Sequence, residues 1–383
     1  MDWYRELGVT PVINATGYVT RLGGSLMLPE VVEAMAAASR AFVSMRELEE
    51  AAGRVIAEIT GAEAGYVTSG AAAGLTMAAA TCIAGADRDR INRLPDTSGV
   101  PHTIVIPGPH RDSYDRCFRV AGARTITAGS PDGCTIDDLQ RAIGPETAAV
   151  AWFSMYEDAL SLPPVVDVAH ARGVPVIVDA AIALPPTTNL RRFIDDGADL
   201  VSFSAGKDMR GPQTAGFLAG RRDLIEPLAL HHQDFAANDG VWEIGPELLS
   251  PGHGLARPMK VGKEELVGAL VALKMYAERD HEVELRAQEE AQRVIAASVP
   301  NAPGVKVTTG REQTPGHWVR VRLEPGVAPQ SAQEVVDRLA NGEPRVMVAA
   351  SVLGPPDTVT IGTATLQPGE AQIVARRLAD ILA

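Results

Sequence analysis

Short apolar runs alternate with segments of helical spacing between residues 64 and 207, and this pattern constrains the fold more than any other feature. Runs of about four to eight apolar residues, rich in β-branched side chains, predict strands that are buried on both faces. Strands that alternate with helices form βαβ units, which build a largely parallel sheet covered by helices on both sides. The runs are AGYVTSG at 64–70, HTIVIPG at 102–108, RTITAG at 124–129, TAAVAWFS at 147–154, VPVIVDAA at 174–181 and ADLVSFSAGK at 198–207.

The segments before and after this region predict three parts. We expect an N-terminal arm over residues 1–27, a large domain over 28–260, and a connector helix with a small C-terminal domain over 261–383. Pro29 opens the first helix of the large domain, a position that suits proline because the first helical N–H has no partner. Residues 261–298 have helical spacing throughout, and the strands and helices that follow predict an α+β domain with an antiparallel sheet.

Lys207 stands out because only five lysines occur among the 35 basic residues and because it follows a strand in a glycine-rich turn. Asp179 ends the preceding strand, one βα unit earlier, and the carboxyl ends of strands are where ligands bind in open α/β sheets. Such an amine and carboxylate are the pair that pyridoxal 5′-phosphate (PLP) chemistry requires. The amine binds the cofactor aldehyde, and the carboxylate keeps the pyridine nitrogen protonated. Taken singly, each residue is also compatible with a surface lysine or a helix-capping carboxylate.

Ser69, Gly70 and Ala71 lie between a predicted strand and a predicted helix. Small residues let the backbone close on an anion, and a helix N-terminus offers free N–H groups and the positive end of the helix dipole. The segment is therefore a candidate phosphate site, with Ser204 as a second donor from the Lys207 loop. An ordinary helix N-cap is the alternative. The G-x-G-x-x-G spacing of a dinucleotide site is absent, which argues against a Rossmann dehydrogenase.

The composition argues against several classes of protein. A formal charge of −13 gives no basic surface for nucleic acid. The chain has no signal-like start and no apolar run of about 18 residues, so we expect a cytoplasmic protein without a membrane partner. The three cysteines lie far apart, and the predicted loop residues His231, His232 and His253 match no zinc spacing, so we expect no metal site.

Together these motifs resemble one group of enzymes. The segments VINATGYVTRLGG, GYVTSGAAAGL, VIVDAA, FSAGKDMRGPQTAG and RPMKVGKEELVGAL occur in the order found in the selenocysteine-synthase-like branch of the fold-type-I PLP-dependent enzymes. The resemblance covers nearly the whole chain and implies the aspartate-aminotransferase-like α/β fold, with a mostly parallel large-domain sheet. LPDTSG and HRDSYDRCFRVAGA look more like the D-glucosaminate-6-phosphate ammonia-lyase type. Because VINATG begins at residue 12, we expect no counterpart of the N-terminal region with which selenocysteine synthase binds tRNA.

By position, the resemblance implies that Lys207 forms the aldimine with PLP and that Asp179 is the partner of the pyridinium nitrogen. His110 follows a strand where such enzymes place a side chain over the cofactor ring, with a histidine hydrogen-bonded in a turn as the alternative. The phosphate region implied by the resemblance comprises Ser69, Gly70, Ala71 and Ser204.

Three arginines also receive roles from the resemblance. Arg111 would reach the phosphate or the substrate. Arg21 would clamp a substrate carboxylate bidentately, or else form a salt bridge between the domains. Arg257 would contact a cofactor phosphate, including that of a partner subunit, because this fold usually builds its site at the interface of a homodimer or higher homo-oligomer.

The implied function is a PLP-dependent lyase for a β-hydroxy amino acid or amino-sugar acid, acting through an aldimine and a quinonoid. Lys207 removes the Cα proton, the β-hydroxyl leaves, and the enamine hydrolyses to a 2-keto acid and ammonia. A racemase or aldolase of a small amino acid is the alternative, with His110 or Tyr114 as a second base. The intact Lys207 and Asp179 argue against a silent scaffold protein, and the missing G-x-S-x-G elbow argues against a serine hydrolase.

Overall fold

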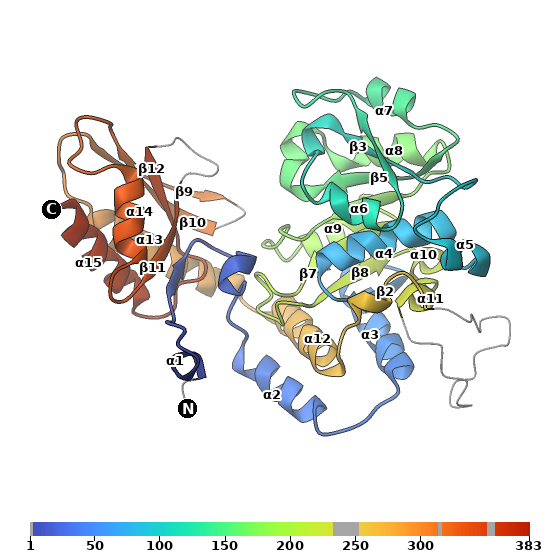
Figure 1. Ribbon diagram of the computed structural model, residues 1–383, viewed down its shortest axis with the longest axis horizontal. Helices are drawn as coiled ribbons and strands as arrows, with labels where there is room; N and C mark the ends of the chain where they lie inside the picture. Colours follow the sequence, from blue (N-terminus) through green and yellow to red (C-terminus); the bar gives the residue numbers. More distant parts are fainter. Residues whose placement is uncertain (1–2, 233–252, 313–315, 351–356) are drawn as a thin grey trace. The chain divides into compact units, whose positions relative to one another are not determined.

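The computed structural model forms two compact units (Figure 1). It describes residues 3–232, 253–312, 316–350 and 357–383. Unit 2 comprises Met27–Glu278, and unit 1 joins Met1–Leu26 to Arg279–Ala383. The N-terminal arm therefore belongs to the same unit as the C-terminal part of the chain, whereas the sequence pattern presents it as a separate segment.

A seven-stranded sheet is the frame of unit 2 and confirms the predicted, largely parallel arrangement. The strand order is β2-β8-β7-β6-β5-β3-β4. Because β8 is antiparallel to both β2 and β7, β2 runs in the same direction as the remaining strands. The six predicted runs all form strands, and β8 is an addition that follows the glycine-rich turn after Lys207. The strands are β2 Ala64–Thr68, β3 Thr103–Pro107, β4 Arg124–Ala128, β5 Thr147–Phe153, β6 Val176–Asp179, β7 Leu200–Ser204 and β8 Gly216–Gly220.

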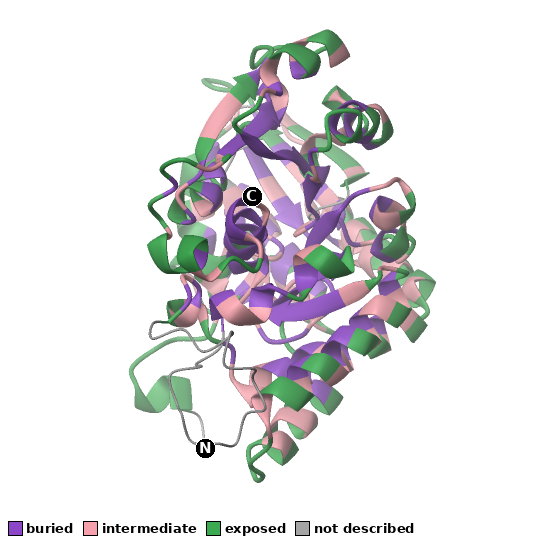
Figure 2. Ribbon diagram, turned by 90° about the vertical axis from the view of Figure 1, so that its right-hand side faces the viewer, coloured by how far each residue is buried: buried purple, intermediate pink, exposed green. Residues whose placement is uncertain are grey.

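Helices bury both faces of this sheet, because successive side chains of a strand point to opposite sides. In β5, Val150 and Trp152 pack into one core with α3, α8, α9 and α12, whereas Ala151 and Phe153 pack into the other with α4 and α6. Figure 2 shows the strands buried and the outer helix faces exposed. The helices are α2 Pro29–Ala38, α3 Met45–Thr60, α4 Ala71–Ala84, α5 Arg88–Arg93, α6 Asp115–Val120, α7 Ile136–Ala142, α8 Leu162–His170, α9 Asn189–Asp195, α10 Arg222–Ile225, α11 Leu228–His232 and α12 Lys263–Glu278.

Unit 1 is built on a five-stranded sheet of order β1-β11-β12-β10-β9. Strands β9 to β12 pair antiparallel, as predicted, but β1 from the N-terminal arm pairs parallel with β11. The predicted antiparallel sheet thus has one parallel edge strand that the prediction did not include, because a three-residue run has no strand signal of its own. The elements are α1 Trp3–Glu6, β1 Ile13–Ala15, α13 His281–Ser298, β9 Val305–Glu312, β10 Gly316–Leu323, α14 Ala332–Ala340, β11 Val346–Ala350, β12 Thr358–Gly362 and α15 Glu370–Leu382.

The predicted connector helix is two helices, α12 and α13. Asp280 separates them and caps α13, because its carboxylate accepts the N–H of Glu282 at 3.0 Å. α12 packs on α2 and α3 and contributes Leu266 and Leu273 to the core of unit 2. The division between the units thus follows α12, whereas the sequence pattern places it before residue 261. In the described segments, no helix is long and apolar enough to cross a membrane.

Candidate active site

The carboxyl edge of the unit 2 sheet brings together the residues that the sequence singles out. β6 ends at Asp179, and its parallel neighbour β7 ends at Ser204, three residues before Lys207. Gly216, the first residue of β8, pairs with Ser204 on one side and with Thr68, the last residue of β2, on the other. The loop after β2 therefore starts at the same edge as the lysine turn. This is the edge at which open α/β sheets bind ligands.

Lys207 lies in a tight turn that is closed by backbone hydrogen bonds. Its carbonyl oxygen accepts the N–H of Arg210 at 2.9 Å, and the N–H of Gly211 is donated to Ala205 at 2.8 Å. Arg210 has a φ of 57°, the left-handed region, which costs a residue with a Cβ about 1–2 kcal/mol. Such strain persists where the surroundings determine the backbone, often beside a functional residue. The turn therefore holds the backbone of Lys207 firmly at the sheet edge.

Asp179 and Lys207 influence each other's ionisation. Burial raises the pKa of Asp179 to about 6, against the opposing effects of the Ala181 N–H, 2.9 Å from Oδ1, and of the Lys207 charge. Burial lowers the pKa of Lys207, and the charge of Asp179 opposes this. A buried carboxylate favours a cation placed beside it, and an amine with a lowered pKa is closer to the neutral form that attacks a carbonyl carbon.

The first turn of α4 is suited to an anion. Gly70 precedes it with a φ of 88°, which glycine adopts without steric cost, and among the described side chains none caps the helix. The first N–H groups of α4 thus have no partner within the helix. Ser202 donates its hydroxyl to the carbonyl of Ala71 at 3.0 Å, and a Cβ at Gly74 would lie 2.4 Å from that hydroxyl oxygen. Because side chains alternate along β7, Ser204 faces the α4 side together with Ser202.

His110 lies below the surface of the site. It has no exposed surface, and its ring packs against Trp152 and Tyr156 at centroid distances of 5.5 and 5.8 Å. Its Nδ1 accepts the N–H of Phe153 at 3.1 Å, and burial lowers the pKa of His110 to about 4. This geometry is that of the alternative, a histidine hydrogen-bonded in a turn, and the stacking role stays a prediction.

Arg111 is engaged by side chains of this chain. It forms an ion pair with Asp115 on α6 and donates to the hydroxyl groups of Thr127 and Thr125 on β4, the latter at 3.3 Å. These contacts use the donors that a phosphate or a substrate would need. In this conformation Arg111 joins α6 to β4, and its predicted binding role stays a prediction.

A hydrogen-bonded pair that the sequence pattern did not single out joins the loops after β3 and β5. Tyr156 donates its hydroxyl to Oδ2 of Asp112 at 2.7 Å, and Oδ1 accepts the Ser113 hydroxyl and the Tyr114 N–H, both at 3.0 Å. Burial and the bond to Asp112 raise the pKa of Tyr156 to about 12. The charge of Asp112 contributes to the raised pKa of Asp179, so the pair lies within electrostatic reach of the candidate site. The signal available in the sequence was that Asp112 and Tyr156 are polar residues soon after the buried strands β3 and β5.

The two remaining candidate arginines lie in short 3-10 helices. Arg21 is exposed in unit 1, two residues before Gly23, which has a left-handed backbone. Arg257 lies in unit 2 near His232, whose pKa is lowered by burial and, to a smaller extent, by the charge of Arg257. Their binding roles stay predictions. His231 and His232 are buried in α11 rather than placed in a loop, and Nδ1 of His232 lies 2.9 Å from the Tyr66 hydroxyl.

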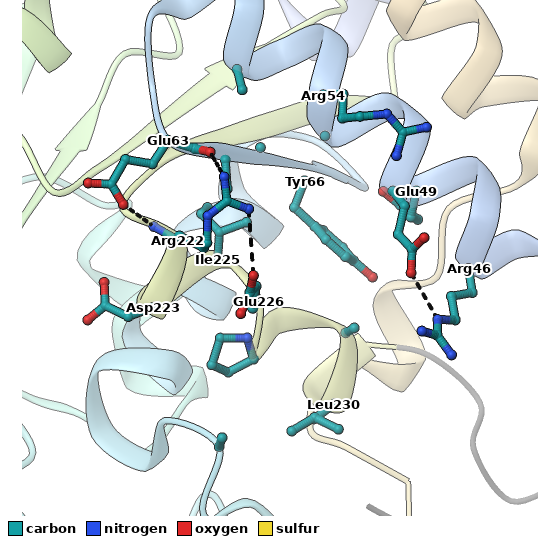
Figure 3. Close-up of a pocket in the computed structure, with 18 residues that line it drawn as sticks. Arg46, Glu49, Arg54, Glu63, Tyr66, Arg222, Asp223, Ile225, Glu226 and Leu230 are labelled. Carbon is teal, nitrogen blue, oxygen red and sulfur yellow. Dashed lines mark hydrogen bonds and ion pairs between the residues drawn. The ribbon is translucent and has the colours of Figure 1, made fainter. Parts of the chain in front are cut away.

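A cavity of about 960 Å³ lies elsewhere in unit 2, among α3, the first half of β2, α10 and α11 (Figure 3). Because β2 runs parallel to β6 and β7, its first half lies toward the edge of the sheet opposite Lys207. Arg222 lines the cavity, donates to the carbonyl oxygen of Glu63 at 2.7 Å and pairs with Glu226 at 3.6 Å. The cavity is therefore separate from the candidate active site.

Known proteins resemble this chain over nearly its whole length. The model of the family described as SelA, L-seryl-tRNA selenium transferase, matches residues 12–316. The chain belongs to the SelA family. A 5'-C-glycyluridine monooxygenase-decarboxylase of Streptomyces sp is 32% identical to this SelA-family member, over 99% of this chain and 92% of the relative.

Two further matches concern a single activity. The D-glucosaminate-6-phosphate ammonia lyase of Salmonella typhimurium (strain 14028s / SGSC 2262) is 31% identical, over 99% of this chain and 97% of the relative. A solved structure of D-glucosaminate-6-phosphate ammonia-lyase superimposes with a TM-score of 0.82 at 31% identity, covering 100% of this chain and 98% of that chain.

These relationships confirm the predicted fold and cofactor. This SelA-family chain is an enzyme of the fold-type-I class that depends on PLP. The residues at the sheet edge fit the cofactor in three respects. A lysine with a lowered pKa suits the aldehyde, a buried carboxylate suits the ring nitrogen, and an uncapped helix N-terminus suits the phosphate.

Proposed function

We propose that this SelA-family chain is a PLP-dependent ammonia-lyase whose substrate is a 2-amino-3-hydroxy acid, such as an amino-sugar acid. The full-length similarity to D-glucosaminate-6-phosphate ammonia lyase carries the proposal. The Lys207–Asp179 pair supports it, because elimination starts with the removal of a proton from Cα by a base beside the cofactor.

Each residue of the site has a distinct task in this proposal. Lys207 binds the cofactor and, once the substrate amine has displaced it, takes the proton from Cα. Asp179 keeps the ring nitrogen protonated, and bound PLP then supplies the electron sink for the negative charge at Cα. The proposed phosphate site, at the first turn of α4, comprises Ser69, Gly70, Ala71 and Ser204.

Arginine side chains are proposed for the acidic groups of the ligands. Arg21 is the candidate for the substrate carboxylate, since a guanidinium binds a carboxylate with two parallel hydrogen bonds. Arg257 is the candidate for a cofactor phosphate, including that of a partner subunit. A substrate contact from Arg111 would require it to leave Asp115, so Arg111 is the weakest of the three.

The cofactor claim is tested by absorption spectroscopy of the purified protein. After reconstitution with PLP, the wild-type protein is expected to show a visible band that borohydride removes. Lys207→Ala loses that band because it has no amine for the aldehyde, whereas Asp179→Asn keeps a band but loses turnover. A wild-type protein that stays colourless after reconstitution contradicts the proposal. The reaction itself is tested by measuring ammonium and 2-keto acid released from D-glucosaminate 6-phosphate and from serine.

The Streptomyces relative favours a second candidate, an oxygen-dependent decarboxylation of an amino acid group. Its identity to this chain is as high as that of the ammonia lyase, and both match over the full length. Consumption of O₂ with release of CO₂, and no keto acid, would identify this reaction. Inversion at Cα without either product would indicate the racemase alternative, and release of an aldehyde would indicate the aldolase.

We also propose a cytoplasmic homodimer or higher homo-oligomer. Large apolar side chains are exposed between the start of unit 2 and α3, where Phe42 is fully exposed and Met27, Val32 and Val43 are partly exposed. Exposed apolar surface of this kind is typical of a face that another subunit covers.

A further inference from the structure

Tyr114 lies at the carboxyl edge of the unit 2 sheet with an accessible phenol. It precedes α6 in the loop that follows β3, and its side chain is half exposed. Its N–H is bound by Oδ1 of Asp112, whose other oxygen is held by the Tyr156 hydroxyl. These two bonds fix the backbone from which the phenol projects. The charge of Asp179 acts on the ionisation of Tyr114, so the phenol is within electrostatic reach of that carboxylate.

The neighbouring groups that carry a proton are less available. The Tyr156 proton is committed to Asp112, and His110 has no exposed surface. Cys117 is a partly buried thiol whose pKa is raised by burial to about 11. Lys207 already takes the Cα proton in the proposed reaction. Of these groups, the phenol of Tyr114 is the accessible donor that has no other task in the proposed reaction.

We propose that Tyr114 is the catalytic acid that protonates the departing β-hydroxyl group of the substrate. This inference rests on the proposed lyase function. As the Cβ–O bond breaks, its electron pair stays on oxygen, the Tyr114 proton is transferred to that oxygen, and water leaves. The phenolate recovers a proton from solvent, to which its half-exposed ring has access. One water molecule later hydrolyses the released product to a keto acid and ammonia, so no oxidant or reductant is needed.

Two carboxylates act on the ionisation of the phenol. Burial raises the pKa of Tyr114, and the negative charges of Asp179 and Asp112 raise it further. The phenol therefore keeps its proton at neutral pH, as an acid must. Positioned acids of this kind typically contribute about 10²–10⁴-fold to a rate.

A comparison of leaving groups in the PLP-loaded enzyme tests the proposal. Hydroxide needs a proton to leave, whereas chloride does not. Tyr114→Phe is therefore expected to lower keto-acid release from serine and D-glucosaminate 6-phosphate by about 10²-fold or more. Release from β-chloroalanine, and exchange of the Cα hydrogen in D₂O followed by NMR, should change less than about threefold. Both enantiomers of each small amino acid are assayed.

Two variants complete the design. Asp112→Asn removes one negative charge near the phenol, so the alkaline limb of the serine rate should move to lower pH while the β-chloroalanine profile stays in place. Tyr4→Phe, an exposed tyrosine of unit 1, is the matched control and should leave all rates unchanged.

The outcomes separate this inference from the proposed function. If Tyr114→Phe slows serine and β-chloroalanine equally, or neither, Tyr114 is not the acid, although the lyase function stands. If the wild-type enzyme releases no keto acid from any of the three substrates, the lyase function itself fails and the inference falls with it.

Discussion

Two carboxyl groups of unit 2, Glu49 and Asp179, are buried in different surroundings. Asp179 lies within electrostatic reach of Lys207, whose positive charge limits the rise of the Asp179 pKa. Glu49 is 4% exposed, and one of its oxygens accepts the N–H of Val67 at 3.1 Å, while the other has no partner in the described part of the chain. Val67 belongs to β2, an edge strand, so Glu49 satisfies a backbone donor that the sheet leaves unpaired.

Replacing Glu49 by glutamine is expected to remove a pH dependence of stability. Burial raises the pKa of Glu49 from 4.5 to about 8, so its stabilising contribution is full below about 4.5 and is lost as the pH rises through 8. Glu49→Gln keeps an acceptor for Val67 without a titrating group. Its Tm should equal or exceed that of the wild type at pH 9, with less advantage at pH 5. Exposed Glu50→Gln is the control, and a Glu49→Gln effect of equal size at both pH values would contradict the assignment.

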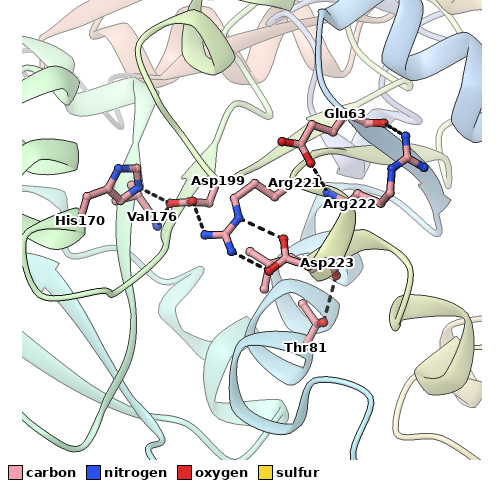
Figure 4. Close-up of polar contacts among 9 residues, drawn as sticks. Glu63, Thr81, His170, Val176, Asp199, Arg221, Arg222 and Asp223 are labelled. Carbon is pink, nitrogen blue, oxygen red and sulfur yellow. Dashed lines mark hydrogen bonds and ion pairs between the residues drawn. The ribbon is translucent and has the colours of Figure 1, made fainter.

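At the scale of elements, Asp199 holds the amino edge of the unit 2 sheet together (Figure 4). It is 2% exposed and precedes β7. Its carboxylate accepts the N–H of Val176 on β6 and Nε2 of His170 on α8, both at 2.7 Å, and Nη1 of Arg221 after β8 at 2.9 Å. One side chain thus connects β6, β7, β8 and α8 at the edge opposite Lys207, which is a structural role.

Asp199→Asn is expected to destabilise unit 2 without altering the chemistry. An amide has one accepting oxygen and cannot accept from all three donors, so a buried donor such as the Val176 N–H loses its partner, which costs about 1–3 kcal/mol. Thermal unfolding should show a clearly lower Tm, while the visible absorption band of the PLP-loaded protein keeps its position. Asp223→Asn removes the exposed partner of the same Arg221 and should cost less than about 1 kcal/mol. Equal losses from the two variants would show that the buried network does not carry the stability.

At the scale of the whole molecule, each unit has its own core, so each unit buries its own sheet. Unit 1 packs α13, α14 and α15 with its five-stranded sheet, and the N-terminal arm contributes Ile13 and Ala15 to that core. The chain therefore leaves unit 1 at Leu26 and returns to it at Arg279. The apolar side chains that remain exposed near α2 are the surface on which the proposed assembly rests.

Phe42→Ser is expected to weaken the proposed assembly. Light scattering after size-exclusion chromatography should give the mass of a dimer or larger oligomer for the wild type. The variant should give a smaller species at micromolar concentration. Serine lacks the apolar surface that the fully exposed Phe42 would bury against another subunit. Val283→Ser, an exposed residue on α13 of unit 1, is the control. A wild-type protein that is monomeric throughout would refute the assembly.

The sequence by itself determined the parallel sheet and the Lys207–Asp179 pair, because both depend on local signals. Alternating apolar runs specify buried strands, and a charged residue after such a run is placed at the sheet edge by the strand itself. Tertiary packing decided three other features. It pairs β1 with β11, a strand far along the sequence, it separates α12 from α13, and it buries His110. The Asp112–Tyr156 bond joins residues 44 positions apart, and only the neighbouring positions of β3 and β5 bring their loops together. The cofactor was predictable because its residues follow local signals. Contacts between distant segments leave no period or spacing in the sequence, so the proposed proton donor became apparent only in the folded chain.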